Sequence, residues 1–190
     1  MKRLSPLLIF ILSLAGCTFL EKSAPSRYYV LPSPQLTSTH TRTLQRKIGI
    51  DPVRLPKYLD RPQLETLTDQ GKMKLAEFHR WAEPFSAGFT RILTGSLAAR
   101  LPASLVVTLP ARYLAPEWIL EIRVHDFLVR QDDCHLRADW RLSGNGKTLT
   151  WHREDIHLPR RNDTYETLPM TMSGAIDTLA ERIVERLPSE

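Results

Sequence analysis

Alternation of apolar and polar positions in the first half of the chain predicts short strands. Strands are expected at residues 27–31 and 47–53, where Pro52 indicates either an edge position in a sheet or an early end. A hairpin is expected over residues 63–76, with its turn at Asp69-Gln70-Gly71. The prolines and polar residues between these segments predict loops.

Two segments change to the helical period. The first follows Pro84, and its apolar residues recur at helical spacing until Pro102: Phe85, Phe89, Ile92, Leu93, Leu97 and Leu101. The second ends at Pro188 and places its apolar residues on one side: Met172, Ile176, Leu179, Ala180, Ile183 and Leu187. Such stripes must be covered, and we expect a sheet to cover them.

The stretch between the two helices predicts further strands. Residues 104–109 form a short continuous apolar run, which is typical of an interior strand. Three longer strands are expected around residues 120–124, around 136–142 and over 147–156, with a turn at Ser143-Gly144-Asn145-Gly146. Their alternation predicts an antiparallel meander with one solvated face.

Helices separated by a meander favour an α+β fold, an α/β sandwich, over a regular βαβ winding. We expect a mixed, largely antiparallel sheet with two long helices in a single domain over residues 27–190.

The N-terminus carries a different pattern. Lys2-Arg3 precedes an apolar segment at residues 7–14, which is followed by Ala15-Gly16-Cys17. The segment is shorter than the roughly 20 residues that a membrane span requires. A charged start, a short apolar run, small residues and a cysteine resemble the signal peptide of bacterial lipoproteins. We therefore expect residues 1–16 to be removed and Cys17 to be acylated, and three acyl chains form a permanent membrane anchor.

Thr18 bears on which membrane holds the protein. In the Gram-negative sorting rule for such lipoproteins, Asp directly after the cysteine retains the protein in the inner membrane. Thr18 therefore implies a lipid anchor in the outer membrane, with the domain facing the periplasm. Residues 17–26, broken by Pro25, are expected to form the lipidated N-terminus and a short tether.

Composition excludes some classes of function. Without residues 1–16 the 190-residue chain keeps 174 residues, with 24 Lys and Arg against 21 Asp and Glu, a net charge of +3. This mild surplus is not the dense basic stripe of a nucleic-acid binder. With Cys17 acylated, Cys134 is the one remaining thiol, so an intrachain disulfide is excluded. We interpret Cys134 as a buried small side chain, the alternative being a reactive thiol.

No motif indicates catalysis or a cofactor. The sequence contains no Gly-x-Ser-x-Gly elbow, no phosphate-binding glycine loop ending in Gly-Lys-Ser/Thr and no His-Glu-x-x-His. Antiparallel pairing within the meander could gather some metal ligands, but their spacing matches no known metal motif. We expect no metal site and solvated or paired side chains instead at these positions: His125, Cys134, His135, His152 and His157.

Charged residues mark the solvated face of the meander. Two interpretations stay open: a cross-strand ladder of opposite charges, or a docking surface whose arginines bind carboxylates of a partner. The arginines are Arg123, Arg137, Arg141 and Arg153, and the acidic residues are Glu121, Asp139 and Glu154. The tryptophans of this region, Trp118, Trp140 and Trp151, are expected in the core.

Residues 48–64 carry a recognisable block, IGIDPVRLPKYLDRPQL, in which an apolar strand is followed by Pro-Val-x-Leu-Pro and Tyr-Leu-Asp-Arg. This block resembles the PqiC family of lipoproteins. Further segments agree with that family over essentially the whole mature chain: Tyr28-Tyr29-Val30-Leu31, Trp81-Ala82-Glu83-Pro84 at the opening of the first helix, and the final helix.

The resemblance implies an auxiliary subunit of an ABC-type or MCE-type lipid-transport system that maintains the envelope. It implies two partners, a periplasm-spanning MCE tunnel protein similar to PqiB and an inner-membrane protein similar to PqiA, and a role in docking rather than catalysis. The implied fold is an α/β sandwich with a mixed sheet. Because MCE tunnels are usually rings, we expect a cyclic homo-oligomer that matches their symmetry.

The loop at residues 55–63 is the expected partner contact. It places Tyr58, Asp60 and Arg61 between two prolines, and an aromatic beside paired charges suits a protein interface. Alternatively, Asp60 and Arg61 tie the loop to the domain. Two other functions stay open: an unrelated outer-membrane assembly factor, and a periplasmic hydrolase whose catalytic residues the sequence does not reveal.

Overall fold

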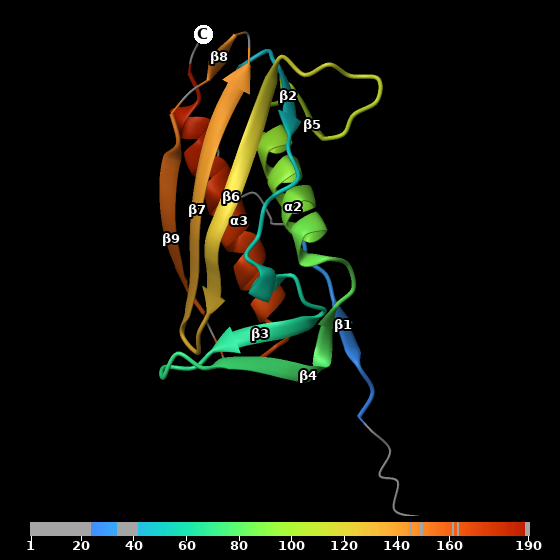
Figure 1. The fold of residues 1–190 in the computed structure, drawn as a ribbon, viewed down its shortest axis with the longest axis vertical. Coiled ribbons are helices and arrows are strands. Elements are labelled where there is room, and N and C mark those ends of the chain that lie inside the picture. Colours follow the sequence, from blue (N-terminus) through green and yellow to red (C-terminus); the bar gives the residue numbers. More distant parts are fainter. Residues whose placement is uncertain are drawn as a thin grey trace, which may run out of the picture.

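The computed structural model describes residues 24–33, 42–144, 146–148, 150–160, 162 and 164–188. Within them, two helices pack on one face of a six-stranded sheet, and a three-stranded sheet lies at one end of the molecule (Figure 1). The elements are β1 (Arg27–Tyr29), β2 (Lys47–Ile50), the 3-10 helix η2 (Lys57–Leu59), β3 (Gln63–Leu67), β4 (Met73–Trp81), α2 (Phe85–Arg100), β5 (Leu105–Thr108), β6 (Trp118–Val129), β7 (Asp133–Gly144), β8 (Lys147–Thr148), β9 (His152–Pro159) and α3 (Leu168–Arg186). The expected α+β fold in a single domain is confirmed.

The large sheet is mixed. β2 pairs in parallel with β5 on one side and β6 on the other, whereas β6, β7 and β9 form an antiparallel meander. Its register sets Ile122 opposite Trp140 and Asp139 opposite Arg153. Because side chains alternate along each strand, one face receives the apolar residues and the other the charged ones. The predicted meander with one solvated face is confirmed.

Two predicted strand positions are wrong. The apolar run that contains β5 lies at the edge of the sheet, not in its interior, and Leu105 is 48% exposed. An apolar run shows that a strand is packed against another element, but not that it has strands on both sides. For β5 this element is α2, which covers one face of the strand. β2, by contrast, is interior and ends at Ile50, so the early-end alternative for Pro52 is confirmed. The strand expected over residues 147–156 is two strands, β8 and β9.

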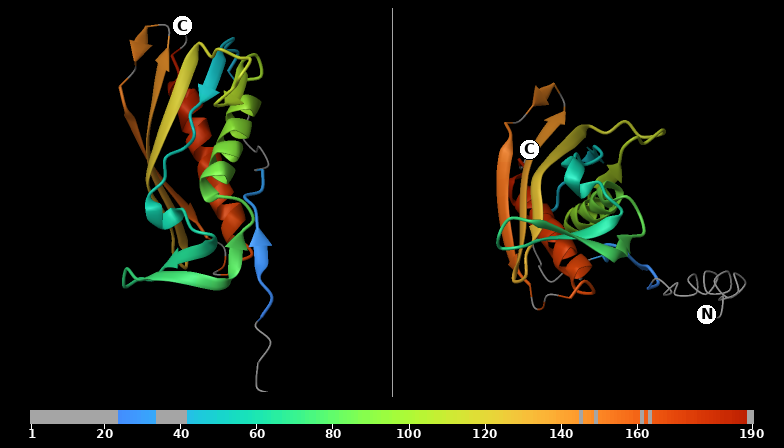
Figure 2. Two further views of the ribbon diagram at one scale, coloured as in Figure 1. Left: turned by 45° about the vertical axis from the view of Figure 1, so that its right-hand side comes forward. Right: turned by 60° about the horizontal axis from the view of Figure 1, so that its bottom comes forward.

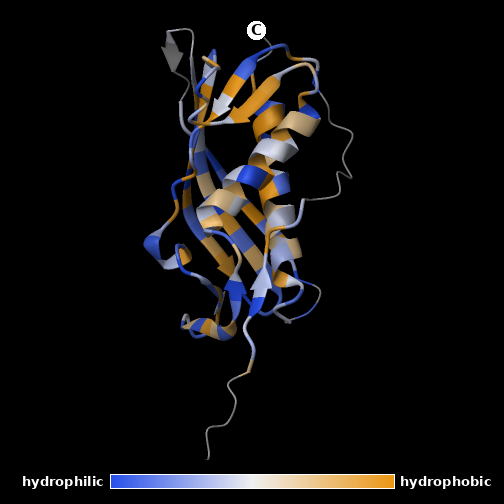
Figure 3. Ribbon diagram, turned by 90° about the vertical axis from the view of Figure 1, so that its right-hand side faces the viewer, coloured by the Kyte–Doolittle hydropathy of each residue, from blue (hydrophilic) through white to orange (hydrophobic). Residues whose placement is uncertain are grey.

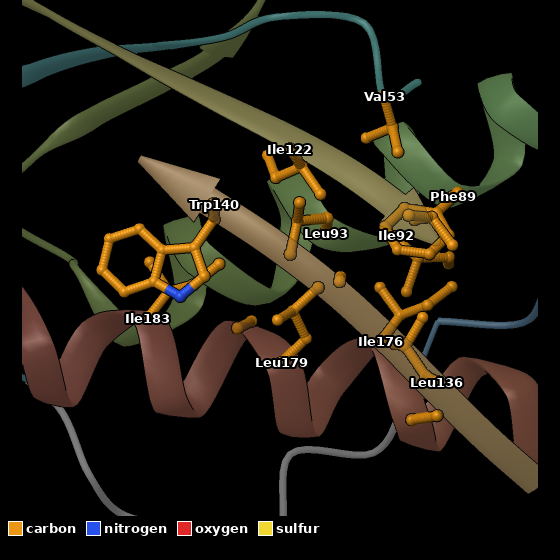
Figure 4. Packing of buried hydrophobic residues seen from close by; sticks show 14 of the residues in the cluster. Val53, Phe89, Ile92, Leu93, Ile122, Leu136, Trp140, Ile176, Leu179 and Ile183 are labelled. Carbon is orange, nitrogen blue, oxygen red and sulfur yellow. The ribbon is translucent and has the colours of Figure 1, made fainter. Parts of the chain in front are cut away.

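The core lies between the large sheet and the two helices. Both predicted helical stripes are buried, and Phe89, Leu93, Ile176 and Leu179 have no exposed surface. Figure 4 shows Trp140 of β7 beside Ile183 of α3 in this layer. The stripes face the sheet because burying them removes apolar surface from water, worth about 25 cal/mol per Å².

An ion pair joins the two helices inside this layer. Arg100 of α2 donates to both carboxylate oxygens of Asp177 of α3, at 2.7 and 2.9 Å. The side chains are 2% and 14% exposed. A bidentate pair of this kind fixes the relative position of two helices, because the guanidinium and carboxylate planes must face each other.

The small sheet has the order β1-β4-β3, with β1 parallel to β4 and β3 antiparallel to it. It lies at the end of the molecule where the described chain begins, away from the C-terminal end of α3 (Figure 2). Trp81 closes β4, and α2 begins only after Pro84, so the Trp81-Ala82-Glu83-Pro84 segment links strand to helix. Hydrophilic and hydrophobic residues alternate along the strands (Figure 3).

Candidate functional site

The loop at residues 55–63 packs against β6. Its 3-10 helix η2 carries Tyr58, whose hydroxyl oxygen accepts a hydrogen bond from the backbone N–H of Phe127 at 3.4 Å. Burial raises the pKa of the Tyr58 phenol, and the nearby carboxylate of Asp126 acts in the same direction. Tyr58 is half-buried and packs on the core. It therefore fixes the loop to the domain, which leaves the exposed charges for any contact with a partner.

Those exposed charges are Asp60 and Arg61. The Arg61 side chain is 54% exposed, and its Nε lies 3.7 Å from Oε1 of Glu65, whose side chain is only 7% exposed. Burial raises the pKa of the Glu65 carboxyl, and the charge of Arg61 partly opposes this. One side of the Arg61 guanidinium therefore faces Glu65, and the rest of the group is open to solvent.

A cavity of about 350 Å³ opens beside these charges. It is lined by Asp60, Arg61, Pro62, Trp81, Ala82, Glu83, Pro84 and Phe85. The ring centres of Trp81 and Phe85 lie 5.0 Å apart. Phe85 is only 2% exposed, so the part-buried Trp81 supplies the aromatic surface beside a rim of mixed charge. Protein–protein interfaces commonly have an apolar centre surrounded by a polar rim.

The outer face of the meander carries a ladder of charge pairs. Arg141 binds Glu121 at 2.6 Å, Arg153 binds Asp139 at 2.8 Å, and Arg137 pairs with Asp126. The hydrogen bond from Arg153 is the largest of the effects that lower the pKa of Asp139 to about 2. The predicted cross-strand ladder is thus present in the structure.

Arg123 stands apart from this ladder. Its guanidinium lies 4.3 Å from the centre of the Trp151 ring, and that of Arg141 lies 4.7 Å from the same ring. Within the part of the chain that the structure describes, no carboxylate pairs with Arg123. An exposed guanidinium held over an aromatic ring is pre-organised to bind a carboxylate from outside.

Two predictions for this region are wrong. Trp151 lies on the outer face beneath the two arginines, not in the core. Glu154 lies on the inner face, where its side chain is 1% exposed and contacts Arg182 and Arg186 of α3. Adjacent residues of a strand point to opposite faces, so Arg153 and Glu154 cannot share the solvated side. Trp118 and Trp140 are buried as expected.

Cys134 and the histidines of the meander separate into several places. Cys134 is fully buried, and burial raises the pKa of its thiol to about 12. His152 stacks on Trp140, with ring centres 4.5 Å apart, and His125 lies 2.9 Å from Asp139. His135 and His157, however, stack on each other with Asp155 beside them. The structure thus brings three of the ligand-type side chains of this region together, which the spacing of the sequence does not indicate.

Residues 29–184 match the family model for the ABC-type transport auxiliary lipoprotein component. The chain belongs to this family of auxiliary lipoproteins. The resemblance to the PqiC family is confirmed, and the family is described as a component of transport, not as an enzyme. The expected lipidation residue Cys17, the expected sorting residue Thr18 and the expected signal peptide at residues 1–16 lie outside the described residues.

Two solved structures share the fold of this auxiliary lipoprotein. One, described as an uncharacterized protein, is 19% identical with a TM-score of 0.72, and the match covers 87% of this chain and 100% of that one. The other, protein XCC0632 from Xanthomonas campestris, is 10% identical with a TM-score of 0.67, covering 83% and 92%. No curated protein sequence matches the chain. Across the described residues, none of the helices is long and apolar enough to cross a membrane.

The structure brings only part of the predicted interface together. Asp60 and Arg61 share the rim of the cavity, while Tyr58 points into the domain, and the outer-face arginines lie on the separate large sheet. Trp81 and Phe85 line the cavity, although the sequence places Trp81 only in the segment that opens the first helix and Phe85 only in the apolar stripe of that helix. Their spacing across a proline was the one signal that could have drawn attention to them.

Proposed function

We propose that the protein is an outer-membrane lipoprotein and the auxiliary, anchoring subunit of an MCE-type intermembrane lipid-transport system that maintains the envelope. The observation that carries this proposal is the match of residues 29–184 to a transport auxiliary lipoprotein family. The segment that ends in Cys17 resembles a lipoprotein signal peptide and supports the lipid anchor, and the Thr18 that follows supports the outer-membrane location.

The partners that we propose are a PqiB-like MCE tunnel protein, a PqiA-like inner-membrane protein and further copies of this chain in a ring. The rim of the cavity is the contact that we assign to the tunnel protein, because it combines aromatic surface with exposed charge of both signs. Trp81 at this cavity pairs with Tyr29 of β1, so the contact lies beside the strand that follows the tether. A tunnel that ends at the outer membrane would reach the domain there.

The anchor is tested by Cys17→Ser. The variant is expected to fold but to leave the membrane fraction, because acyl chains supply the strong membrane contact and each buried CH₂ adds about 0.8 kcal/mol. Fractionation by density gradient, followed by immunoblotting, measures this. A variant that still sediments with outer membranes as fully as the wild type would contradict the lipid anchor.

The partnership is tested in detergent extracts by capture of the MCE protein and by native mass measurement. The wild type is expected to form a cyclic oligomer and to bring down the MCE protein. Asp60→Lys combined with Arg61→Gln should weaken capture, because it changes the charges at the rim of the cavity without touching Tyr58 or placing a second carboxylate beside Glu65. The matched control is Asp69→Lys with Lys72→Gln, two exposed residues at the β3–β4 turn.

A monomer that captures no MCE protein at any ionic strength would reject the docking role and favour the assembly-factor alternative. Equal capture by the Asp60/Arg61 variant and by its control would move the contact away from the cavity. An alanine variant of Arg123 then tests the outer face, where the guanidinium over Trp151 is open to a carboxylate.

A further inference from the structure

Two histidines meet on the outer face of the large sheet. His135 of β7 and His157 of β9 are direct partners in the antiparallel register. Their rings are stacked, with centres 4.1 Å apart and planes inclined by only 11°. Asp155 Oδ1 lies 2.7 Å from Nε2 of His135 and 3.1 Å from Nε2 of His157. Two imidazole nitrogens thus lie close to the same carboxylate oxygen.

We propose that His135, Asp155 and His157 bind one divalent transition-metal ion of the zinc or copper class. Their ligand atoms all lie within 4.8 Å of one another. Atoms bonded at about 2.0–2.2 Å to one tetrahedral ion lie about 3.3–3.6 Å apart, so the Asp155 carboxylate must turn slightly away from the two nitrogens to admit the ion. His135 is 16% exposed and provides a fixed ligand, while Asp155 and His157 are each 58% exposed and have room to turn.

Asp133 completes the arrangement from behind. Its Oδ2 lies 3.1 Å from Nδ1 of His157. With the ring proton on Nδ1 and donated to this carboxylate, Nε2 keeps a free lone pair that points to the ligand cluster. A carboxylate behind a histidine is the common support of metal-binding imidazoles, since it fixes the tautomer and the ring orientation. Arg130, 3.9 Å from Asp133, neutralises part of the added charge.

Asp155 supplies the anionic ligand of the site, because an aspartate carboxyl is ionised at neutral pH. Imidazole and carboxylate together favour zinc, copper and nickel over calcium or magnesium, which prefer oxygen ligands alone. Arg137 also faces Asp155, but its guanidinium is paired with Asp126.

The bound ion would join β9 to β7. β9 pairs with β7, and on the described residues no strand pairs with its other side. Three protein ligands leave a coordination position for water or for a side chain of another protein. This proposal rests on the geometry of the sheet and is independent of the role in lipid transport.

Titration of the purified, detergent-solubilised full-length protein with zinc chloride, after removal of metals by a chelator and without any histidine tag, tests the site. Calorimetry should show one zinc ion per chain. Asp155→Asn and His157→Gln should each weaken binding by at least about tenfold, and Asp133→Asn by about tenfold. The control is His125→Gln, which removes a carboxylate-paired histidine from the same face and should leave the affinity unchanged.

A second measurement guards against misfolded variants. Saturating zinc should raise the urea midpoint of the wild type and of His125→Gln, because an ion that binds only the folded state stabilises it. It should leave the midpoint of Asp155→Asn unmoved, and the exposure of Asp155 allows that variant to fold. Equal zinc affinity in the wild type and in Asp155→Asn, or an equal loss in His125→Gln, would overturn the site.

Discussion

Glu154 provides a sharp test of how this fold is held together. The carboxylate, 1% exposed, lies on the inner face of β9, where Arg186 reaches Oε1 at 2.5 Å and Arg182 reaches Oε2 at 3.4 Å. Trp140 donates to Oε1 at 3.2 Å. The two arginine side chains are 37% and 48% exposed. The acid is therefore shut off from water, whereas its basic partners are not.

This asymmetry predicts that the two ways of breaking the same ion pairs differ in cost. Glu154→Gln leaves an acceptor for Trp140 and lets both arginines turn to water, so we expect a loss of about 1–2 kcal/mol. Arg182→Gln with Arg186→Gln leaves a buried carboxylate without its counter-charges, and we expect a loss of about 3–5 kcal/mol. For a chain of this size, 4 kcal/mol corresponds to a fall in Tm of about 8–16 °C.

Urea unfolding followed by tryptophan fluorescence measures these free energies. Arg182 also donates to the carbonyl oxygen of Asp155 at 2.8 Å, and the double arginine variant loses that bond too. The triple variant, with Glu154→Gln added, loses the same bond but has no buried charge, and we expect it to be more stable than the double by about 2 kcal/mol. A triple variant no more stable than the double would refute the reasoning.

The exposed pair Arg27 and Glu166 is the control for this experiment. Its atoms are 2.8 Å apart, within the range of the Glu154 pairs, but the side chains are 65% and 53% exposed. Breaking it from either side should leave the urea midpoint nearly unchanged, with no difference between the two variants, because exposed ion pairs contribute little to stability.

Three further predictions follow from single positions. Cys134, buried and with a thiol pKa of about 12, should resist a thiol reagent in the folded protein and react in urea, and fast labelling of the native state would contradict this. The pKa of Asp139 is lowered from 3.8 to about 2. Its pairing with Arg153 therefore stabilises the fold at a pH above 3.8, and this stabilisation is lost as the pH falls towards 2. Arg153→Gln should accordingly lower the urea midpoint at about pH 6 but not near pH 2. Gly144→Ala should cost about 3 kcal/mol, because its Cβ would lie 2.1 Å from a backbone carbonyl oxygen. Gly95→Ala in α2, whose Cβ would meet no neighbouring atom, should be neutral or stabilising.

The periodic elements of this protein follow from its sequence alone. The apolar residues of α2 and α3 recur at helical spacing, and those of β6 and β7 alternate with polar ones. Because one side of each element is buried, its apolar residues repeat with the period of a helix or of a strand, and this period can be read from the sequence. Prolines at positions 84, 102 and 188 mark where helices begin or stop, because proline cannot continue an upstream helical hydrogen-bond pattern. The sequence also predicts the burial of Cys134, because a cysteine without a disulfide partner is typically a small buried side chain.

Only the tertiary structure decided which strands are neighbours and which side chains meet. Sequence does not show that β2 lies inside the sheet and β5 at its edge, because parallel partners come from distant segments. Because β8 and β9 are separate strands, the alternation of side chains in β9 does not continue that of β8. In β9 Glu154 faces the core, and Trp151, just before this strand, lies on the outer face. His135 meets His157 only because the β7–β9 register sets them opposite each other, and a shift of one residue would separate them.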